Sequence, residues 1–206
     1  MFKKPVLYVI TDENILEKNL IDAVKQALEG GADVIQYRAK NKDTREMYQE
    51  ASQLKKICKY YGKPLIINDR VDIAMAVDAD GVHIGQDDMP VEVVRRLVGF
   101  NKIVGLSTKN LQQVEEANSL PVDYIGFGSI FPTTTKKDAK VAGIENLEKV
   151  VKISLVPVVA IGGIDESNVS QVLKTGCDGI AVVSAVFKRN PKQAAINLKE
   201  KMKMET

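Results

Sequence analysis

Three threonines and a lysine, Thr133, Thr134, Thr135 and Lys136, end a glycine-containing stretch that begins at residue 126. Glycine lets backbone N–H groups approach a ligand, and hydroxyl groups beside an ammonium group can bind an oxyanion. The alternative is a surface turn in which these residues serve only the backbone. Other anion-binding residues at the same end of the fold favour a phosphate-binding loop.

An amide and two cationic side chains alternate at the end of an apolar run, at Gln36, Arg38 and Lys40. In an extended segment, alternate side chains point the same way. An arginine beside a lysine is a recurrent phosphate clamp, so the pattern predicts an anion site. The alternative is a charged strand end that faces water.

Carboxylates end the next two apolar runs, at Asp69 and at Asp87 or Asp88. If the runs are neighbouring strands, Asp69 can face one of the other two. Mg²⁺ takes one or two carboxylates and completes its shell with water and phosphate oxygens, so the pair predicts a Mg²⁺ site shared with a phosphorylated ligand. The competing role for Asp87 or Asp88 is to cap a helix that begins near Pro90.

Neutral groups follow other apolar runs, at Ser107, the pair Gly162 and Gly163, and Ser184. The glycine pair allows backbone N–H contact with a phosphate, although a plain turn is the alternative. Ser107 has no base and orienting group to activate it as a nucleophile, so we expect it to form hydrogen bonds. His83 is the only histidine, and its apolar neighbours place it in the core.

Eight apolar runs alternate with eight segments of helical spacing. The expected strands are 6–10, 33–37, 64–67, 81–84, 102–106, 122–125, 157–160 and 179–183. The expected helices are 16–28, 44–61, 71–77, 90–98, 111–118, 144–151, 167–174 and 191–202. Four of the runs are introduced by an aspartate after a small or apolar residue, which indicates a repeated unit.

Continuous rather than alternating apolar runs are typical of buried parallel strands. Together with the alternation they predict a (β/α)₈ TIM barrel, an α/β fold, as one domain over residues 1–206. A doubly wound open sheet is the alternative, but no Gly-x-Gly-x-x-Gly pattern follows the first run. In a barrel, the chemistry is expected at the carboxyl ends of the strands.

The amino-acid composition limits the classes of partner that the protein is expected to bind. The net charge is +2, with 27% charged and 45% hydrophobic residues, and no basic run indicates nucleic-acid binding. The two cysteines, Cys58 and Cys177, show no pairing or metal-binding spacing and are expected to be buried thiols in a reducing compartment. No signal peptide or membrane span is recognised, so we expect a cytoplasmic protein without membrane partners. A homo-oligomer is left open.

The candidate residues separate into two anion sites, a charged one with two carboxylates and a mostly neutral one. The charged site holds Arg38, Lys40, Asn68 and Lys136; the neutral one holds Thr133, Thr135, Gly163 and Ser184. A metal-assisted diphosphate site beside a metal-free monophosphate site indicates a transferase that joins two phosphorylated small molecules.

Six motifs in this order resemble the thiamine-phosphate synthase family. They lie at residues 8–12, 36–40, 67–70, 81–88, 128–136 and 160–164. The resemblance implies a (β/α)₈ barrel that joins hydroxymethylpyrimidine diphosphate to a thiazole phosphate with Mg²⁺, releasing diphosphate. It also implies a dissociative reaction, in which diphosphate leaves before the thiazole nitrogen attacks, and this fits a site that offers leaving-group electrostatics without a nucleophile.

The resemblance also implies the roles of individual residues. The pyrimidine diphosphate contacts would be Gln36, Arg38, Lys40, Asn68, Ser107 and Lys136, of which Arg38, Lys40, Ser107 and Lys136 are the expected catalytic groups. Asp69 and Asp88 would bind Mg²⁺, which leaves Asp87 as the expected helix cap. The thiazole phosphate site would comprise Thr133, Thr134, Thr135, Gly163, Val183 and Ser184.

Two rival functions remain on the same fold. A thiazole tautomerase uses a histidine in the loop after the sixth strand, where this chain has Ser129 and no histidine. A non-catalytic binder of phosphorylated ligands is the other alternative, and the two retained carboxylates argue against it.

Overall fold

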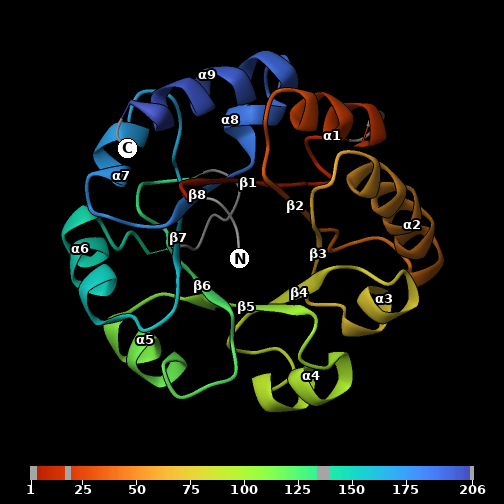
Figure 1. Ribbon diagram of the computed structural model, residues 1–206, viewed down its shortest axis with the longest axis horizontal. Coiled ribbons are helices and arrows are strands. Elements are labelled where there is room, and N and C mark those ends of the chain that lie inside the picture. Colours follow the sequence, from red (N-terminus) through yellow and green to blue (C-terminus); the bar gives the residue numbers. More distant parts are fainter. Residues whose placement is uncertain (1–3, 17–19, 134–139, 205–206) are drawn as a thin grey trace.

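Eight parallel strands close into a barrel in the order β1 to β8, with helices around the outside (Figure 1). The structure is a computed structural model that describes residues 4–16, 20–133 and 140–204. The strands are β1 Val6–Ile10, β2 Val34–Tyr37, β3 Leu65–Asn68, β4 Gly81–Ile84, β5 Ile103–Thr108, β6 Tyr124–Gly128, β7 Val158–Ile161 and β8 Gly179–Val182. The predicted fold class is therefore confirmed.

The helices follow the strands, as expected from the alternation of patterns. They are α1 Leu20–Glu29, α2 Thr44–Tyr60, α3 Val71–Ala76, α4 Val91–Val98, α5 Leu111–Ala117, α6 Ile144–Ile153, α7 Val169–Leu173, α8 Ser184–Phe187 and α9 Pro191–Lys203. The short helix α8 directly after β8 was not predicted, because four residues are too few to show helical spacing.

Each strand buries both of its faces, which explains the continuous apolar runs. On β1, Leu7 and Val9 belong to the core between barrel and helices. The alternate residues Val6, Tyr8 and Ile10 belong to a second core inside the barrel. The interior is thus filled by side chains, and only the rim at each end is open to ligands.

Four strands end later than predicted, β3 and β7 by one residue, β5 by two and β6 by three. β5 includes Ser107, and β6 runs on to Gly128, so the first residues of the glycine-containing stretch are strand rather than loop. Gly126 pairs with Ser107 and Gly128 pairs with Ile161 across the sheet. A side chain at Gly128 would overlap the Ile161 carbonyl group, so here glycine permits close pairing rather than a turn.

The aspartates that introduce four strands form a repeated contact at the amino-terminal ends of the strands. Each carboxylate accepts a hydrogen bond from the backbone N–H of the preceding strand, at 2.6 to 2.9 Å. The pairs are Asp33 with Leu7, Asp80 with Leu65, Asp123 with Val104, and Asp178 with Val158. Each carboxylate also forms an ion pair with a lysine or arginine. The aspartates therefore stabilise the barrel on the face opposite the predicted site.

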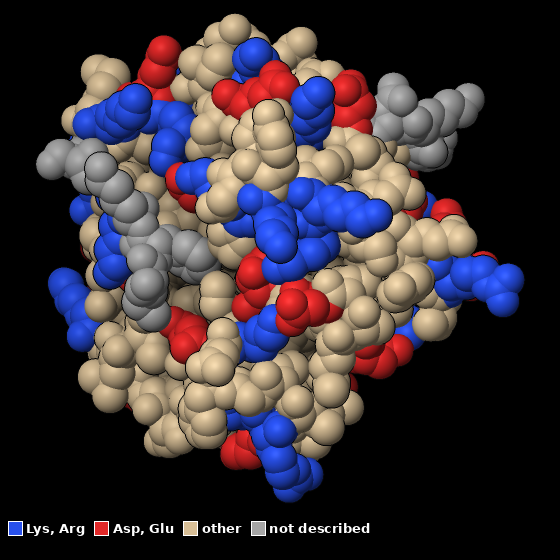
Figure 2. All heavy atoms as spheres, turned by 45° about the vertical axis from the view of Figure 1, so that its right-hand side comes forward, with Lys and Arg blue, Asp and Glu red and all other residues tan. Residues whose placement is uncertain are grey.

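The surface shows basic and acidic side chains close together on the face in Figure 2, in line with the small net charge. Within the described ranges, no helix is long and apolar enough to cross a membrane. Cys58 and Cys177 are both free and buried, as predicted.

Candidate functional site

The carboxyl ends of β2, β3 and β4 bring together three of the predicted charged side chains. Lys40, beyond β2, forms an ion pair with Asp69, which directly follows β3. Asp88, beyond β4, lies close enough to Asp69 to perturb its ionisation. Arg38 follows β2 at the same end of the barrel, where it is half-buried and pairs with Asp12 instead. These contacts form the charged side of the barrel mouth.

Arg38 is held in place from β1. Its Nη1 donates to Asp12 Oδ2 at 3.0 Å, and the Asp12 side chain is nearly fully buried. The Arg38 backbone N–H donates to the Thr11 hydroxyl at 2.9 Å. Because β1 and β2 pair in parallel, residues just beyond their ends lie side by side. Thr11 and Asp12 follow the first expected strand and belong to the motif at residues 8–12, but their position beside Arg38 is visible only in the structure.

Asp69 has the geometry of a specialised site. Its φ is +59°, a left-handed conformation that is uncommon outside glycine and recurs at functional sites. Its backbone N–H donates to the His83 carbonyl oxygen at 2.8 Å, which fixes the residue against β4. Burial raises the pKa of Asp69, Asp88 raises it further, and Lys40 opposes the rise. Two mutually repelling carboxylates are a suitable pair for a divalent cation.

The two carboxylates fit Mg²⁺ better than a metal held by protein alone. Among the described residues, no group of three or more His, Cys, Asp or Glu side chains could hold a metal ion. Mg²⁺ commonly uses one or two carboxylates together with water and phosphate oxygens. Asp69 and Asp88 could therefore hold Mg²⁺ when a phosphorylated ligand supplies the remaining oxygens.

The predicted helix cap is wrong for both Asp87 and Asp88. Helix α4 has Pro90 at its N-cap and no side-chain hydrogen bond there. Asp88 Oδ2 instead accepts the Gly85 N–H at 2.7 Å, which closes the turn after β4. The sequence pattern resembles a cap because aspartate before proline is common at helix starts. Here the turn orients Asp88 toward Asp69.

A buried hydrogen-bond chain joins two further predicted residues, Gln36 and Ser107. Gln36 Nε2 donates to the Tyr8 hydroxyl at 2.9 Å, and the Tyr8 and Tyr124 hydroxyls are 2.7 Å apart. The Tyr124 hydroxyl lies 2.8 Å from His83 Nδ1, and His83 Nε2 lies 2.8 Å from Ser107 Oγ. The chain thus runs through the barrel from β2 to β5.

The three central members of this chain are polar groups in a dry interior. Tyr8, His83 and Tyr124 are all less than a tenth exposed. Burial lowers the pKa of His83 to about 4 and raises the pKa of both tyrosines, so all three are neutral at pH 7. His83 is a core residue as predicted, but it also contacts Ser107. In the sequence, this hydrogen-bond chain could have been recognised because each of three apolar strands contains one polar residue.

The ends of β7 and β8 lie across the mouth and form the mostly neutral side. Gly162 and Gly163 have φ values of +101° and +66°. A Cβ at Gly163 would lie 2.5 Å from the Pro132 carbonyl oxygen, so the glycine lets the loops after β6 and β7 touch. β7 and β8 pair directly, which brings Val183 and Ser184 beside this loop. Both are half-buried at the start of α8.

Of the remaining candidate residues, the structure describes only some. Asn68 is the last residue of β3 and is half-buried beside Asp69. Thr133 is described and half-buried, close to the Gly163 loop through its neighbour Pro132. Thr134, Thr135 and Lys136 lie outside the described residues. Their predicted contacts therefore stay predictions.

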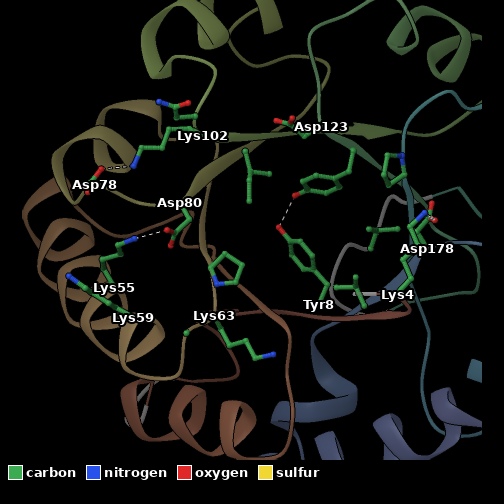
Figure 3. A pocket seen from close by; sticks show the side chains of 18 residues that line it. Lys4, Tyr8, Lys55, Lys59, Lys63, Asp78, Asp80, Lys102, Asp123 and Asp178 are labelled. Carbon is green, nitrogen blue, oxygen red and sulfur yellow. Dashed lines mark hydrogen bonds and ion pairs between the residues drawn. The ribbon is translucent and has the colours of Figure 1, made fainter. Parts of the chain in front are cut away.

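A cavity of about 780 Å³ lies at the opposite, amino-terminal face of the barrel (Figure 3). Its lining includes Lys55 and Lys102, each paired with an aspartate, Asp80 and Asp78 respectively. Two of the strand-linking aspartates described above, Asp123 and Asp178, also line it. These charges already have partners within the fold, so we assign the cavity a structural role and place the chemistry at the carboxyl ends.

Fold and site together define a barrel enzyme that handles phosphorylated small molecules, because cations, a carboxylate pair and a glycine loop converge at the catalytic end. Residues 7–186 match the family described as thiamine monophosphate synthase. The chain belongs to this family, and it is a transferase of thiamine biosynthesis.

Individual relatives agree with this assignment. The chain is 64% identical to the thiamine-phosphate synthase of Persephonella marina over 183 residues, which cover 88% of each chain. It is 52% identical to the thiamine-phosphate synthase of Pyrococcus horikoshii, over 90% of this chain and 88% of the relative. The solved thiamine phosphate pyrophosphorylase of Pyrococcus furiosus superposes with a TM-score of 0.91 at 45% identity, covering 98% and 96%.

Proposed function

We propose that the barrel mouth joins hydroxymethylpyrimidine diphosphate to 4-methyl-5-(2-phosphooxyethyl)thiazole, or to its carboxylated precursor, in a Mg²⁺-dependent reaction. The products are thiamine phosphate and diphosphate. The observation that carries the proposal is the convergence of Lys40, Asp69 and Asp88 on one side of the mouth. The similarity to proteins named thiamine-phosphate synthase supports it.

The charged side would bind the pyrimidine diphosphate. Asp69 and Asp88 would hold Mg²⁺, which when bound neutralises charge on the diphosphate oxygens. Arg38 and Lys40 would donate charge-assisted hydrogen bonds to the same group. Gln36, Asn68, Ser107 and Lys136 complete the set that we assign to this substrate.

The neutral side would bind the thiazole phosphate. Gly163 is left-handed in the loop after β7, and its carbonyl group accepts a hydrogen bond from Asn168, so its backbone N–H is the group that would contact the phosphate. Val183 and Ser184 lie beside this loop. Loops after the seventh and eighth strands commonly bind phosphate in such barrels. We assign Thr133, Thr134 and Thr135 to the same phosphate. A neutral cradle suits this group because the thiazole phosphate stays intact and need not be activated.

The residues would act mainly on the leaving group. The bond between the pyrimidine methylene carbon and the diphosphate oxygen breaks, and its electron pair leaves with the diphosphate. Arg38, Lys40 and Lys136 stabilise the negative charge that develops there. The thiazole nitrogen then supplies the electron pair of the new carbon–nitrogen bond. No protein nucleophile is needed, and Ser107 serves as a hydrogen-bonding group.

We also place this enzyme in the cytoplasm, with small molecules as its ligands and without nucleic-acid or membrane partners. Two free, buried cysteines support a reducing compartment. Size measurement in solution decides whether the enzyme is a homo-oligomer.

The test is diphosphate release from the purified chain with both substrates and Mg²⁺. We expect release only when both substrates and a divalent cation are present, with thiamine phosphate formed in equal amount. No product with either Mg²⁺ or Mn²⁺, while thiazole phosphate still binds, would overturn the proposal. Conversion of the thiazole substrate alone to an isomer would favour the tautomerase instead.

A further inference from the structure

Four hydrogen bonds cross the barrel interior and join two residues that we assign to the pyrimidine diphosphate, Gln36 and Ser107. The intermediate groups are Tyr8, Tyr124 and His83. Figure 3 shows the Tyr8 hydroxyl directed into the barrel, where it forms its hydrogen bond with Tyr124. The chain therefore connects the strand that carries Gln36 with the strand that carries Ser107 through three buried side chains.

Counting protons gives the chain a direction. The Gln36 amide nitrogen can only donate, so the Tyr8 oxygen accepts and the single Tyr8 proton goes to Tyr124. The Tyr124 proton then goes to His83 Nδ1, which must be unprotonated. The neutral ring consequently carries its proton on Nε2 and donates it to Ser107 Oγ. Every donor in the chain has one acceptor.

This direction fixes what the two ends offer at the mouth. Ser107 Oγ accepts from His83, so its own proton is free to be donated outward. The Gln36 amide uses a nitrogen proton inside the barrel, so its carbonyl oxygen is free to accept. In the reverse direction the Ser107 proton would be given to His83. A site for an oxygen-rich diphosphate needs donors, and the inferred direction supplies one at Ser107.

We propose that Tyr8, Tyr124 and His83 are positioning residues that present Ser107 as a donor and Gln36 as an acceptor to the pyrimidine diphosphate. This inference rests on the proposed function, in which Gln36 and Ser107 contact that substrate. The three residues act through these two and do not touch the reacting atoms. Their hydrogen bonds decide that Ser107 donates to the substrate and that Gln36 accepts from it.

The packing holds the chain in one arrangement. The Tyr8 and Tyr124 ring centroids are 5.8 Å apart, and those of His83 and Tyr124 are 5.5 Å apart. A Cβ at Gly105 would overlap the Tyr124 ring, so glycine in β5 makes room for it. A buried hydroxyl without a partner is costly, which keeps each proton in its place.

The first test reads the direction in the unaltered protein. His83 is the only histidine, so ¹⁵N-histidine labelling of a chain without a histidine tag gives one imidazole signal by NMR. We expect the neutral ring protonated at Nε2 at pH 7, without ligand. A ring protonated at Nδ1, an even mixture of both tautomers, or an imidazolium would overturn the inference. None of these outcomes depends on activity, so failure here leaves the proposed function standing.

The second test asks whether the chain matters for binding. Tyr124→Phe removes one hydroxyl and two hydrogen bonds while keeping the ring. We expect the KM for pyrimidine diphosphate to rise about 10-fold, the effect of losing one to two buried hydrogen bonds, with the KM for thiazole phosphate unchanged. The NMR spectrum of this variant should also show the His83 ring as a mixture of both tautomers.

Tyr37→Phe is the matched control. Tyr37 is also buried and also forms a hydroxyl hydrogen bond, to Glu50 at 2.5 Å, but it points away from the barrel interior. The Tyr37→Phe substitution should leave the NMR signals of the His83 ring and both KM values unchanged. If Tyr124→Phe raises both KM values alike, or behaves as Tyr37→Phe does, the positioning role is wrong. Absence of any turnover in the unaltered protein would instead count against the proposed function.

Discussion

Lys40 pairs with Asp69 across the carboxyl ends of β2 and β3, so the ammonium group contacts the carboxylate that we assign to Mg²⁺. Burial and the neighbouring Asp88 raise the pKa of Asp69, and Lys40 partly offsets that rise. A bound cation would take over the role of neutralising Asp69. Lys40 would then be free to contact the diphosphate, which links cation binding to substrate binding.

Asp69→Asn tests this arrangement. Losing a carboxylate that holds the cation should lower kcat by about 100-fold, comparable with the loss of a major electrostatic contact. The affinity for thiazole phosphate should change less than about 2-fold, because that site lies across the mouth. Steady-state kinetics and calorimetric titration measure the two effects. Asp87→Asn, at an exposed neighbouring position, is the control. Equal losses in turnover and thiazole phosphate affinity would contradict the division into two sites.

Lys136→Ala tests a residue assigned from the sequence. Removal of an ammonium that contacts the leaving group should raise the KM for pyrimidine diphosphate about 10-fold, as for a lost charge-assisted hydrogen bond. The KM for thiazole phosphate should stay nearly constant. Lys140→Ala, at an exposed position close in sequence, should leave both values unchanged. A normal rate in a correctly folded Lys136→Ala variant removes this lysine from the site.

Gly163→Ala tests the loop after β7. The left-handed backbone costs about 1–2 kcal/mol for any residue with a side chain, and the methyl group would also press on Pro132. We expect thiazole phosphate affinity to fall about 10-fold through displacement of the loop. Gly62→Ala is a close control, because Gly62 has a similar φ of +62° but no atom within 4 Å of the added methyl. Equal losses of affinity in both variants would refute the steric argument.

Asp123→Ala tests the contacts at the opposite face. The Asp123 carboxylate accepts the Val104 N–H at 2.7 Å and pairs with the buried Arg95 at 2.6 Å. Its removal should lower the free energy of unfolding by about 2 kcal/mol, since Arg95 and the N–H lose a partner. The kcat of the folded enzyme should not change. Urea unfolding measures the loss.

Asp78→Ala gives the comparison for that experiment. Asp78 pairs with Lys102 on the same face, but its side chain is 85% exposed. An exposed pair contributes about 0–1 kcal/mol, so this variant should lose clearly less stability than Asp123→Ala. If the two variants lose the same stability, the repeated aspartate contacts are not what stabilises the barrel.

The sequence by itself determined the order of strands and helices and the end of the barrel where the charged groups gather. Hydrophobic periodicity is a local property, and parallel strands put their carboxyl ends on one face whatever their exact register. For that reason Arg38, Lys40, Asp69 and Asp88 could be assigned to one mouth. Their spacing also carried the resemblance that the family match confirmed.

Only the tertiary structure decided which side chains meet inside the closed barrel. Tyr8 and Tyr124 are 116 residues apart, and their contact depends on strand stagger and barrel closure, which no local pattern encodes. The same holds for Asp123, which reads as the start of a strand and proves to bind Val104 and Arg95. Local sequence selects the elements, whereas closure of the barrel selects the partners of the buried polar groups.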